Sequence, residues 1–373
     1  MARPLNLLRT VAWAVLGLLA LSNLATSPAT AQTAAQALPA QPGSRTQIVL
    51  LGTAGGPPLR LHRAEPSTLL VVDGRLYLFD CGLGAVRQSM AAGFRPEDIH
   101  TVFLTHHHPD HTLDLVGLMG NAAFTADAGP NPQKLKIYGP PGTVAFTDAA
   151  ITYLGVPFGQ FAAENLRPPW PPRGLFEAHD VSSNGLVYSD DKIRVFATEN
   201  SHYSQMKPAE RQGRIAFSYR IETPDAVIVI TGDTGPSAAV TKLAEGADVL
   251  VTEAMDMPSM EALIDRTFTA RPVDKRPPPA AIQSILGHMR FEHLDLPEVR
   301  NLAAAAKVRS VIVTHIGPEA DAFPEKGTFA AQIQQGLKIP VMQGRDLARY
   351  CISGSSAGGS AIVECPLPQT VLP

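Results

Sequence analysis

The residues best suited to chemistry lie in one short segment, where three histidines and an aspartate have the spacing His-x-His-x-Asp-His, beginning at His106. Imidazole and carboxylate groups together suit Zn²⁺ and related divalent metals. In an extended chain, residues two apart share a face, so His106 and His108 can reach one ion while His107 points away. Asp110 and His111 follow where the strand ends and would reach a neighbouring position. The spacing therefore predicts a two-metal site with one pair of ligands for each ion.

Such a site needs further ligands, and three candidates stand where an apolar strand gives way to a loop: His202, Asp233 and His315. Strand ends on a rigid scaffold are the usual location of functional residues. The alternatives are a helix N-cap for Asp233 and a buried, hydrogen-bonded role for His315. His179 competes with His202, although no strand precedes it. We expect His202, Asp233 and His315 to complete the site.

Strands dominate the first half of the chain and alternate with helices throughout, which favours sheets covered by helices. A turn at Asp73-Gly74 predicts a hairpin. The Gly-rich turn from Gly52 to Pro58 is weak evidence for phosphate binding, because it lacks the lysine of a P-loop. Strands are predicted at 47–51, 67–72, 75–79, 100–105, 134–138, 192–197, 214–221, 226–231, 248–252 and 310–314, and helices at 84–93, 111–124, from 143 to about 154, at 236–245, from about 258, and at 296–306.

Two proline-rich stretches, 155–185 and 266–280, interrupt this pattern. Proline can continue neither a helix nor a central strand, so both are interpreted as surface loops near the mouth of the site. In the first loop, aromatic side chains would either line a substrate pocket or pack on the body of the domain. These aromatic residues are Phe158, Phe161, Trp170 and Phe176.

The N-terminus has the features of an export signal: Arg3 and Arg9 precede a short apolar run, and Ala29-Thr30-Ala31 offers a cleavage site. The apolar run is too short to span about 30 Å of hydrocarbon, so we expect no stable membrane anchor. The protein would then be periplasmic or secreted. The predicted division is a signal peptide at 1–31, a disordered leader at 32–45, one large domain at 46–350 and a C-terminal tail at 351–373.

The composition and net charge of the chain argue against a large nucleic-acid partner. The formal net charge is −3 and no dense run of Lys and Arg occurs, whereas a nucleic-acid-binding protein normally shows a basic surface. Three cysteines are present. Cys351 and Cys365 would form a disulfide in an oxidising compartment, or else remain free thiols. Cys81 ends an apolar strand and is interpreted as a small buried residue.

The ordered set of histidines and aspartates resembles the metallo-β-lactamase fold superfamily, and most closely the ribonuclease Z branch of phosphodiesterases. Three further segments are similar to motifs of that branch. They are the turn Leu51-Gly52-Thr53, the segment Phe79-Asp80-Cys81-Gly82 with Arg87-Gln88 after it, and Ile137-Tyr138-Gly139-Pro140-Pro141-Gly142. The resemblance extends from residue 48 to about residue 318.

The resemblance implies an α/β (α+β) fold, a four-layer αββα sandwich with two divalent ions, Zn²⁺ first and Mn or Fe as alternatives. It also implies a catalytic histidine that donates a proton, at His293 or, failing that, at His288. The ligand set that it implies is His106, His108 and His202 for the first ion, Asp110, His111 and His315 for the second, and Asp233 as the bridge.

The chain departs from the branch at several positions. The acidic residue expected after Phe-Asp-Cys-Gly is Leu83, the threonine two positions later is Ala85, and His293 is followed by Leu294. Glu-Ala-Thr becomes Glu-Ala-Met, beginning at Glu253. No basic, Gly/Pro-rich arm of the kind that grips transfer RNA is present. We therefore expect the scaffold to be inherited and the substrate to be a small molecule rather than a nucleic acid.

Two adjacent ions hold a shared hydroxide at neutral pH, because metal binding lowers the pKa of water to about 7. Asp110 would orient this hydroxide and His293 would protonate the leaving oxygen. The sequence thus predicts a hydrolase of small phosphodiesters or related esters. The alternatives are a lactonase or β-lactam-type hydrolase, a diiron or persulfide-type oxidoreductase, and a non-catalytic metal-binding protein. A homodimer is compatible with the sequence.

Overall fold

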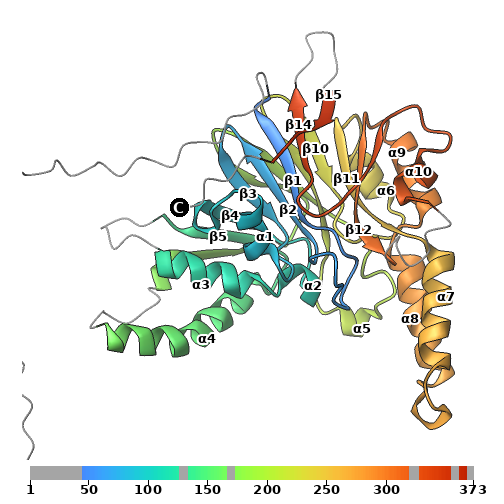
Figure 1. The fold of residues 1–373 in the computed structure, drawn as a ribbon, viewed down its shortest axis with the longest axis horizontal. Coiled ribbons are helices and arrows are strands. Elements are labelled where there is room, and N and C mark those ends of the chain that lie inside the picture. Colours follow the sequence, from blue (N-terminus) through green and yellow to red (C-terminus); the bar gives the residue numbers. More distant parts are fainter. Residues whose placement is uncertain (1–43, 126–132, 166–172, 319–326, 354–360, 368–373) are drawn as a thin grey trace, which may run out of the picture. The chain divides into compact units, whose positions relative to one another are not determined.

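The computed structural model describes residues 44–125, 133–165, 173–318, 327–353 and 361–367. The predicted signal peptide, all but the last two residues of the predicted leader, and Trp170 lie outside these ranges. Two β-sheets form the centre of the fold (Figure 1).

The first sheet has eight strands in the order β15-β14-β1-β2-β3-β4-β5-β6. β1, β2 and β3 are antiparallel neighbours, whereas β3 to β6 run parallel. The predicted hairpin at Asp73-Gly74 is confirmed, since Val72 pairs with Arg75. The strands are β1 (Thr46–Gly52), β2 (Ser67–Val72), β3 (Arg75–Phe79), β4 (Ile99–Phe103), β5 (Leu135–Gly139), β6 (Phe176–Asp180), β14 (Arg349–Ser353) and β15 (Ala361–Glu364).

The second sheet has seven strands in the order β13-β12-β11-β10-β9-β8-β7. Its β10 to β13 run parallel, and β7 to β10 are antiparallel neighbours. The strands are β7 (Gly185–Ser189), β8 (Arg194–Glu199), β9 (Phe217–Glu222), β10 (Val227–Ile230), β11 (Val249–Met255), β12 (Val311–Gly317) and β13 (Val341–Gln343).

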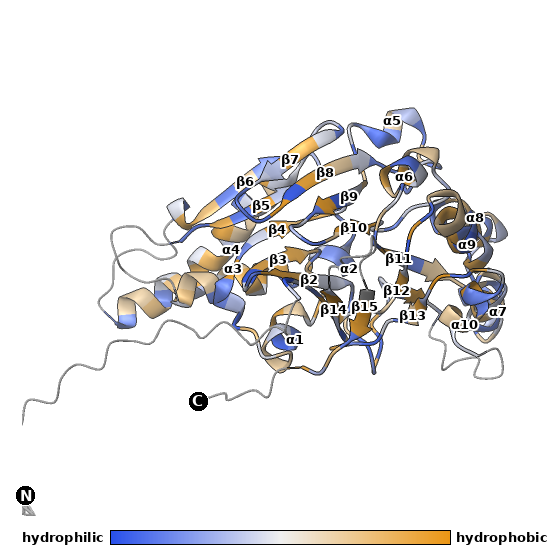
Figure 2. Ribbon diagram, turned by 90° about the horizontal axis from the view of Figure 1, so that it is seen from above, coloured by the Kyte–Doolittle hydropathy of each residue, from blue (hydrophilic) through white to orange (hydrophobic). Residues whose placement is uncertain are grey.

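The two sheets pack face to face because their strands alternate in what they bury. Ile48 and Leu50 of β1 pack with Phe217 and Tyr219 of β9 in the central core. Val49 and Leu51, which alternate with these two residues along β1, pack on the outer face of the sheet instead. Successive side chains of a strand point to opposite faces. In Figure 2 strand β3 carries much of the apolar colouring.

Helices cover both outer faces. Side chains of α1, α3 and α4 bury the outer face of the first sheet, and side chains of α6, α9 and α10 bury that of the second. The predicted αββα sandwich is therefore confirmed. The helices are α1 (Ala85–Ala91), α2 (Pro109–Thr112), α3 (Leu115–Thr125), α4 (Thr143–Glu164), α5 (Pro208–Arg211), α6 (Ala238–Leu243), α7 (Met257–Thr269), α8 (Pro279–Glu292), α9 (Leu296–Ala305) and α10 (Phe329–Gln334), with 3-10 turns η1 (Pro96–Asp98), η2 (Arg173–Leu175) and η3 (Val273–Lys275).

The prediction of a loop over 155–185 is wrong, because α4 continues through Pro157 to Glu164 and the described residues after it form η2, β6 and part of β7. A proline inside a helix costs about 3 kcal/mol. Burial of Leu154 and Ala162 on the same helix face offsets that cost. The aromatic residues of this stretch pack on the body of the domain: Phe158 and Phe176 in the outer core, and Phe161 against Phe124 at 5.4 Å.

The second proline-rich stretch, 266–280, is also mostly regular. It contains the end of α7, the turn η3 and the first residues of α8. Pro278 is the N-cap of α8 and Pro279 its first residue, a position where proline is favoured because its missing N–H needs no partner. α7 and α8 extend from the sandwich as a pair (Figure 1).

Two smaller expectations also change. The helix expected at 111–124 is divided into α2 and α3. The expected C-terminal tail instead adds β14 and β15 to the first sheet, with β14 paired to β1. Cys351 and Cys365 form a disulfide bond in this region, and Cys81 is buried, as predicted.

Candidate metal centre

The carboxyl ends of several strands meet at one edge of the sandwich and carry the candidate site residues. β4 leads into His106 and His108, and β8 leads into His202. β10 ends shortly before Asp233, while His315 lies within β12. β4 runs parallel to its neighbours in the first sheet, and β10 to β12 run parallel in the second. Parallel strands end at the same edge, which is where α/β sheets place their ligands.

The first group consists of His106, His108, His202 and Asp233, whose nearest ligand atoms all lie within 4.8 Å of one another. The His202 Nε2 atom is 3.1 Å from His108 Nδ1. His106 Nε2 is 3.8 Å from Asp233 Oδ2, and His202 Nε2 is 3.9 Å from that same oxygen. Three imidazole nitrogens thus converge on one side of the Asp233 carboxylate.

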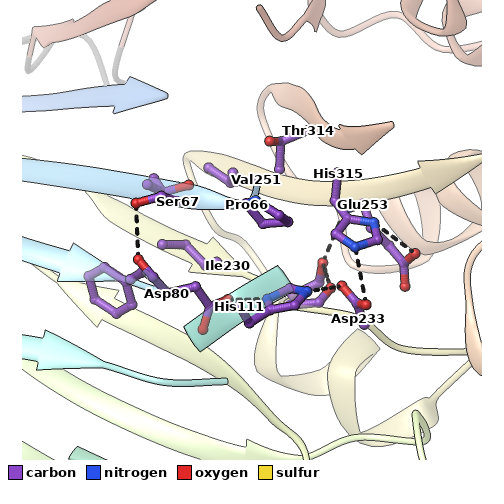
Figure 3. Close-up of a pocket in the computed structure, with 14 residues that line it drawn as sticks. Pro66, Ser67, Asp80, His111, Ile230, Asp233, Val251, Glu253, Thr314 and His315 are labelled. Atoms are coloured by element: carbon purple, nitrogen blue, oxygen red, sulfur yellow. Dashed lines mark hydrogen bonds and ion pairs between the residues drawn. The ribbon is translucent and has the colours of Figure 1, made fainter. Parts of the chain in front are cut away.

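The second group consists of Asp110, His111, Asp233 and His315, whose nearest ligand atoms again lie within 4.8 Å of one another. His111 Nε2 is 3.3 Å from Asp233 Oδ1, and His315 Nε2 is 3.2 Å from Asp233 Oδ2. Asp110 Oδ2 lies 3.5 Å from His315 Nε2. Figure 3 shows His111, Asp233 and His315 facing one another. Asp233 therefore belongs to both groups and lies between them.

Hydrogen bonds on the far side of three rings fix which nitrogen faces the centre. His111 Nδ1 donates to Asp80 at 2.8 Å, and His202 Nδ1 donates to the backbone oxygen of Glu292 at 2.9 Å. His106 Nδ1 is 3.0 Å from the hydroxyl of Thr105. Each ring is thereby left with Nε2 toward the centre, which is how partners behind a metal-binding histidine orient it.

Asp80 is a residue of the site that the sequence reasoning missed. Its carboxylate accepts hydrogen bonds from the Thr105 backbone N–H at 2.8 Å and from the Thr105 hydroxyl at 2.9 Å, besides that from His111. Asp80 and His315 both have positive φ, 58° and 41°, which is uncommon for residues other than glycine and concentrates at functional sites. An acidic residue directly after an apolar strand was the available signal.

Glu253 was noted from the sequence only as a departure from a motif. In the structure its buried carboxylate is 2.7 Å from His293 Nδ1 and accepts from Thr234 N–H at 2.6 Å. Figure 3 shows Glu253 beside His315. His293 is buried and forms a further group with His202 and His288. His288 is more exposed, and its Nδ1 contacts Glu292 at 2.5 Å.

Two histidines considered from the sequence lie elsewhere. His179 is on β6 at the edge of the first sheet, where its ring stacks on Tyr138 at 4.5 Å. His107 contacts the hydroxyl of Thr143 at 2.9 Å. The structure therefore brings His202, and not His179, to the centre.

Two glycines, Gly56 of the Gly-rich turn and Gly82 after β3, lie close to Asp110 of the second group. A Cβ atom added to Gly56 would lie 2.3 Å from Asp110 Oδ2, and one added to Gly82 would lie 2.1 Å from the Asp110 backbone oxygen. Real Cβ atoms do not approach so closely, so both positions need glycine for the close approach of two backbones. Contact with Asp110, rather than phosphate binding, explains these glycines.

The centre favours positive charge. Burial would raise the pKa of Asp233, but His315 and His111 hold that pKa well below its ordinary value. Burial would likewise lower the pKa of His111, but Asp233, Asp80 and Asp110 raise it well above the ordinary value. By contrast, burial lowers the pKa values of His106 and His202. The neutral His106 and His202 and the ionised Asp233 are in the state in which metal ligands bind, whereas His111 would have to release a proton on metal binding.

Within the described part of the chain, several buried atoms of the centre have no hydrogen-bond partner. They are His106 Nε2, Asp110 Oδ1, His111 Nε2, Asp233 Oδ1 and His315 Nε2. Leaving such atoms buried without a partner costs about 1–3 kcal/mol each. These five atoms are imidazole nitrogen or carboxylate oxygen, the donors that Zn²⁺ and similar ions prefer. The residues present therefore fit a pair of divalent cations.

Comparison with known proteins places this geometry in a family. A family model described as the beta-lactamase superfamily domain matches residues 75–316. A ribonuclease Z of Mycobacterium sp. strain KMS is 30% identical over 297 residues, which cover 78% of this chain and 93% of the relative. A ribonuclease Z of Mycobacterium marinum is 29% identical over 272 residues, covering 73% of this chain and 86% of the relative.

Solved structures show the same fold. The metallo-beta-lactamase fold protein YhfI from Bacillus subtilis superposes with a TM-score of 0.57 at 15% identity, covering 82% of this chain and 99% of that chain. The short form of human tRNase Z superposes with a TM-score of 0.52 at 18% identity, covering 81% and 98%. The chain therefore belongs to the metallo-β-lactamase fold superfamily and, within it, to the branch that contains ribonuclease Z.

Proposed function

We propose that this protein is an exported hydrolase that uses two divalent metal ions to cleave small phosphodiesters or related esters. One observation carries the proposal: of the three four-residue groups of metal-ligand type that contain Asp233, two have only Asp233 in common, and the third adds Glu253 and His293 to Asp233 and His315. A single structural ion would need only one such group. Family membership supports the same chemistry, because the relatives named above are called ribonuclease Z.

In this proposal His106, His108 and His202 would hold the first ion and Asp110, His111 and His315 the second, and Asp233, which belongs to both groups, would be a ligand common to both. When bound, the ions would supply a nucleophile by lowering the pKa of water to about 7 and would stabilise developing negative charge. Nitrogen-rich ligation favours Zn²⁺, with Mn and Fe as alternatives.

Asp110 would orient the attacking water, and His293 would donate a proton to the leaving oxygen. Asp110 Oδ1 has no hydrogen-bond partner among the described residues, so it is free to accept a hydrogen bond from an attacking water and orient it. Burial raises the pKa of Glu253 well above its ordinary value, so its carboxyl can supply a proton. As His293 Nε2 donates its hydrogen to the leaving oxygen, the Glu253 proton would move to His293 Nδ1, 2.7 Å away, so the imidazole stays neutral and Glu253 becomes the carboxylate.

A panel of substrates tests the proposal. The Zn²⁺-loaded protein should hydrolyse bis(p-nitrophenyl) phosphate, and lactones and β-lactams should react at least tenfold more slowly. A reversed order would favour ring hydrolysis at the same site. Because the relatives are named ribonuclease Z, the panel includes a structured RNA. Cleavage of that RNA, with little turnover of small diesters, would contradict the proposed substrate class.

Export is the second part of the proposal. The predicted signal peptide lies in residues 1–43, outside the described part of the chain. The Cys351–Cys365 disulfide supports an oxidising compartment, because such bonds are rare in the cytosol of most organisms. Among the described helices, none is long and apolar enough to span a bilayer. N-terminal sequencing of the protein from a bacterial periplasm should begin at Gln32, and an intact N-terminus in the cytosol would contradict export.

A further inference from the structure

Four exposed leucines lie on the chain segments that border Asp110, and we call them the apolar rim. Single exposed apolar side chains are ordinary, but a group of them beside a site marks a binding surface. The exposed fractions are 66% for Leu59, 89% for Leu61, 40% for Leu83 and 52% for Leu113.

The loop that carries Leu59 and Leu61 is held at both ends. At its start, Gly55 N–H donates to the backbone oxygen of Ile316 at 3.0 Å, next to His315. At its end, Ala64 N–H donates to Asp346 Oδ2 at 2.6 Å. The two ends of the loop are thus held in place, and the loop begins at Gly56, whose backbone lies close to Asp110.

The other two segments of the rim are joined to this loop and to α2. Leu83 N–H donates to Glu65 Oε2 at 3.0 Å, and Glu65 N–H donates to the backbone oxygen of Leu83 at 3.1 Å. Leu113 follows α2, and the next residue, Asp114, donates its N–H to the backbone oxygen of Cys81 at 3.0 Å. These backbone hydrogen bonds place all three leucine-bearing segments around Asp110.

The loop that carries Leu59 and Leu61 also carries cationic side chains. The loop Gly56-Pro57-Pro58-Leu59-Arg60-Leu61-His62-Arg63 has no acidic residue. Arg60 Nε is buried and has no hydrogen-bond partner among the described residues, whereas Arg63 is used internally, donating to Gly344 O at 3.2 Å. Arg60 is only partly buried and has no ion pair among the described residues. Hydrocarbon beside such a cation suits a ligand that joins an apolar chain to an anionic group.

We propose that the apolar rim binds the hydrocarbon part of an amphiphilic, anionic ester substrate whose ester group lies at the metal centre. This inference rests on the proposed function and narrows its substrate class from small esters to esters with an alkyl or acyl chain. The rim lies on the Asp110 side, so the chain would extend away from the centre over Leu59 and Leu61.

A homologous series of p-nitrophenyl alkyl phosphates (ethyl, butyl, hexyl) tests the inference with the Zn²⁺-loaded protein. Full burial of a methylene is worth about fourfold in binding, and the partial burial that an exposed rim offers about twofold. kcat/KM should therefore rise roughly 16-fold from ethyl to hexyl. In a Leu59→Ser/Leu61→Ser variant the rise should fall below about threefold. Leu186→Ser is the matched control, because Leu186 is 53% exposed on β7 and lies outside the rim.

Calorimetric binding of ethyl and hexyl phosphate separates this inference from the proposed function. The protein could fail to hydrolyse any phosphodiester and still bind hexyl phosphate more tightly than ethyl phosphate. If the double variant then loses this preference, the proposed function is contradicted and binding of the chain by the rim is supported. Equal kcat/KM and equal binding for all chain lengths would overturn the rim. So would a double variant that loses binding to anionic phospholipid vesicles while keeping its chain-length dependence, since the leucines would then contact a membrane.

Discussion

Replacing Asp80 by asparagine should weaken the second metal position without unfolding the protein. The change keeps the shape of the side chain but exchanges one carboxylate oxygen for an NH₂ group. Asp80 Oδ1 accepts from the Thr105 backbone N–H at 2.8 Å, so the amide oxygen of the new side chain must stay there. The NH₂ group then faces His111 Nδ1, which donates to Asp80 Oδ2 at 2.8 Å in the native protein.

Two donors cannot bond to each other, so the His111 proton must move from Nδ1 to Nε2, the atom that would hold the ion. A hydrogen bond to a charged group is worth about 1.5–3 kcal/mol. At 1.4 kcal/mol for each factor of ten, the loss corresponds to roughly 10- to 100-fold in affinity for the second ion, in line with the effect of mutating partners behind metal ligands.

Titration of the metal-free protein with Zn²⁺ in the presence of a competing chelator measures this effect. The wild type should bind two ions, and Asp80→Asn should bind the first normally and the second roughly 10- to 100-fold more weakly. Asp346→Asn is the control, because Asp346 accepts from Ala64 N–H and from the Thr53 hydroxyl but contacts no histidine among the described residues. Unchanged binding of both ions to Asp80→Asn would refute the reasoning.

Three further predictions concern other parts of the molecule. His293→Ala should keep both ions and lose about 10²- to 10⁴-fold in phosphodiesterase rate; full activity would exclude an acid role. Asp190→Asn should lower the free energy of unfolding by about 2 kcal/mol at pH 7, because the pKa of Asp190 is lowered to about 2 despite its burial, first by Tyr77. This stabilisation is present above the unfolded pKa near 4 and is lost as the pH falls toward 2, so chemical denaturation at pH 2 should show no difference. Replacing Cys351 and Cys365 by serine should cost about 3 kcal/mol, given their separation of 14 residues, and should abolish the effect of a reductant on Tm.

The strand ends explain why so much of the centre could be predicted. His106 and Asp233 each follow an apolar strand and His315 lies near the end of one, where a polar side chain has few structural uses. That local signal indicated the positions, and the parallel order of the strands then brings them to one edge. The structure gathers every predicted ligand position into the two groups; that they bind metal stays a proposal.

The partners behind the ligands could not be predicted in the same way. Asp80 directly follows the apolar strand β3 and Glu253 lies near the end of β11, but nothing local shows which histidine each will contact. His111 and Asp80 are 31 residues apart in sequence, and His293 and Glu253 are 40 apart. Such pairings depend on which strands become neighbours, and only the folded chain determines this.

Predictions of where helices and strands end, made from local residues such as proline, were wrong where contacts with distant parts of the chain stabilise the element. Pro157 predicts the end of a helix, yet Leu154 and Ala162 gain more by staying on one buried face of α4. Strand β14 was overlooked because it is short and precedes a Gly/Ser-rich segment, although pairing with β1 stabilises it. In both cases the deciding contact lies far away in the sequence.

The central claim is that these residues bind two metal ions with Asp233 between them. A crystal of the Zn²⁺-loaded protein, measured at the zinc absorption edge, tests it most directly. We expect two anomalous peaks, one about 2.0–2.2 Å from nitrogens of His106, His108 and His202, and one at the same distance from His111, His315 and Asp110. A single peak, or two peaks that Asp233 does not join, would contradict the account.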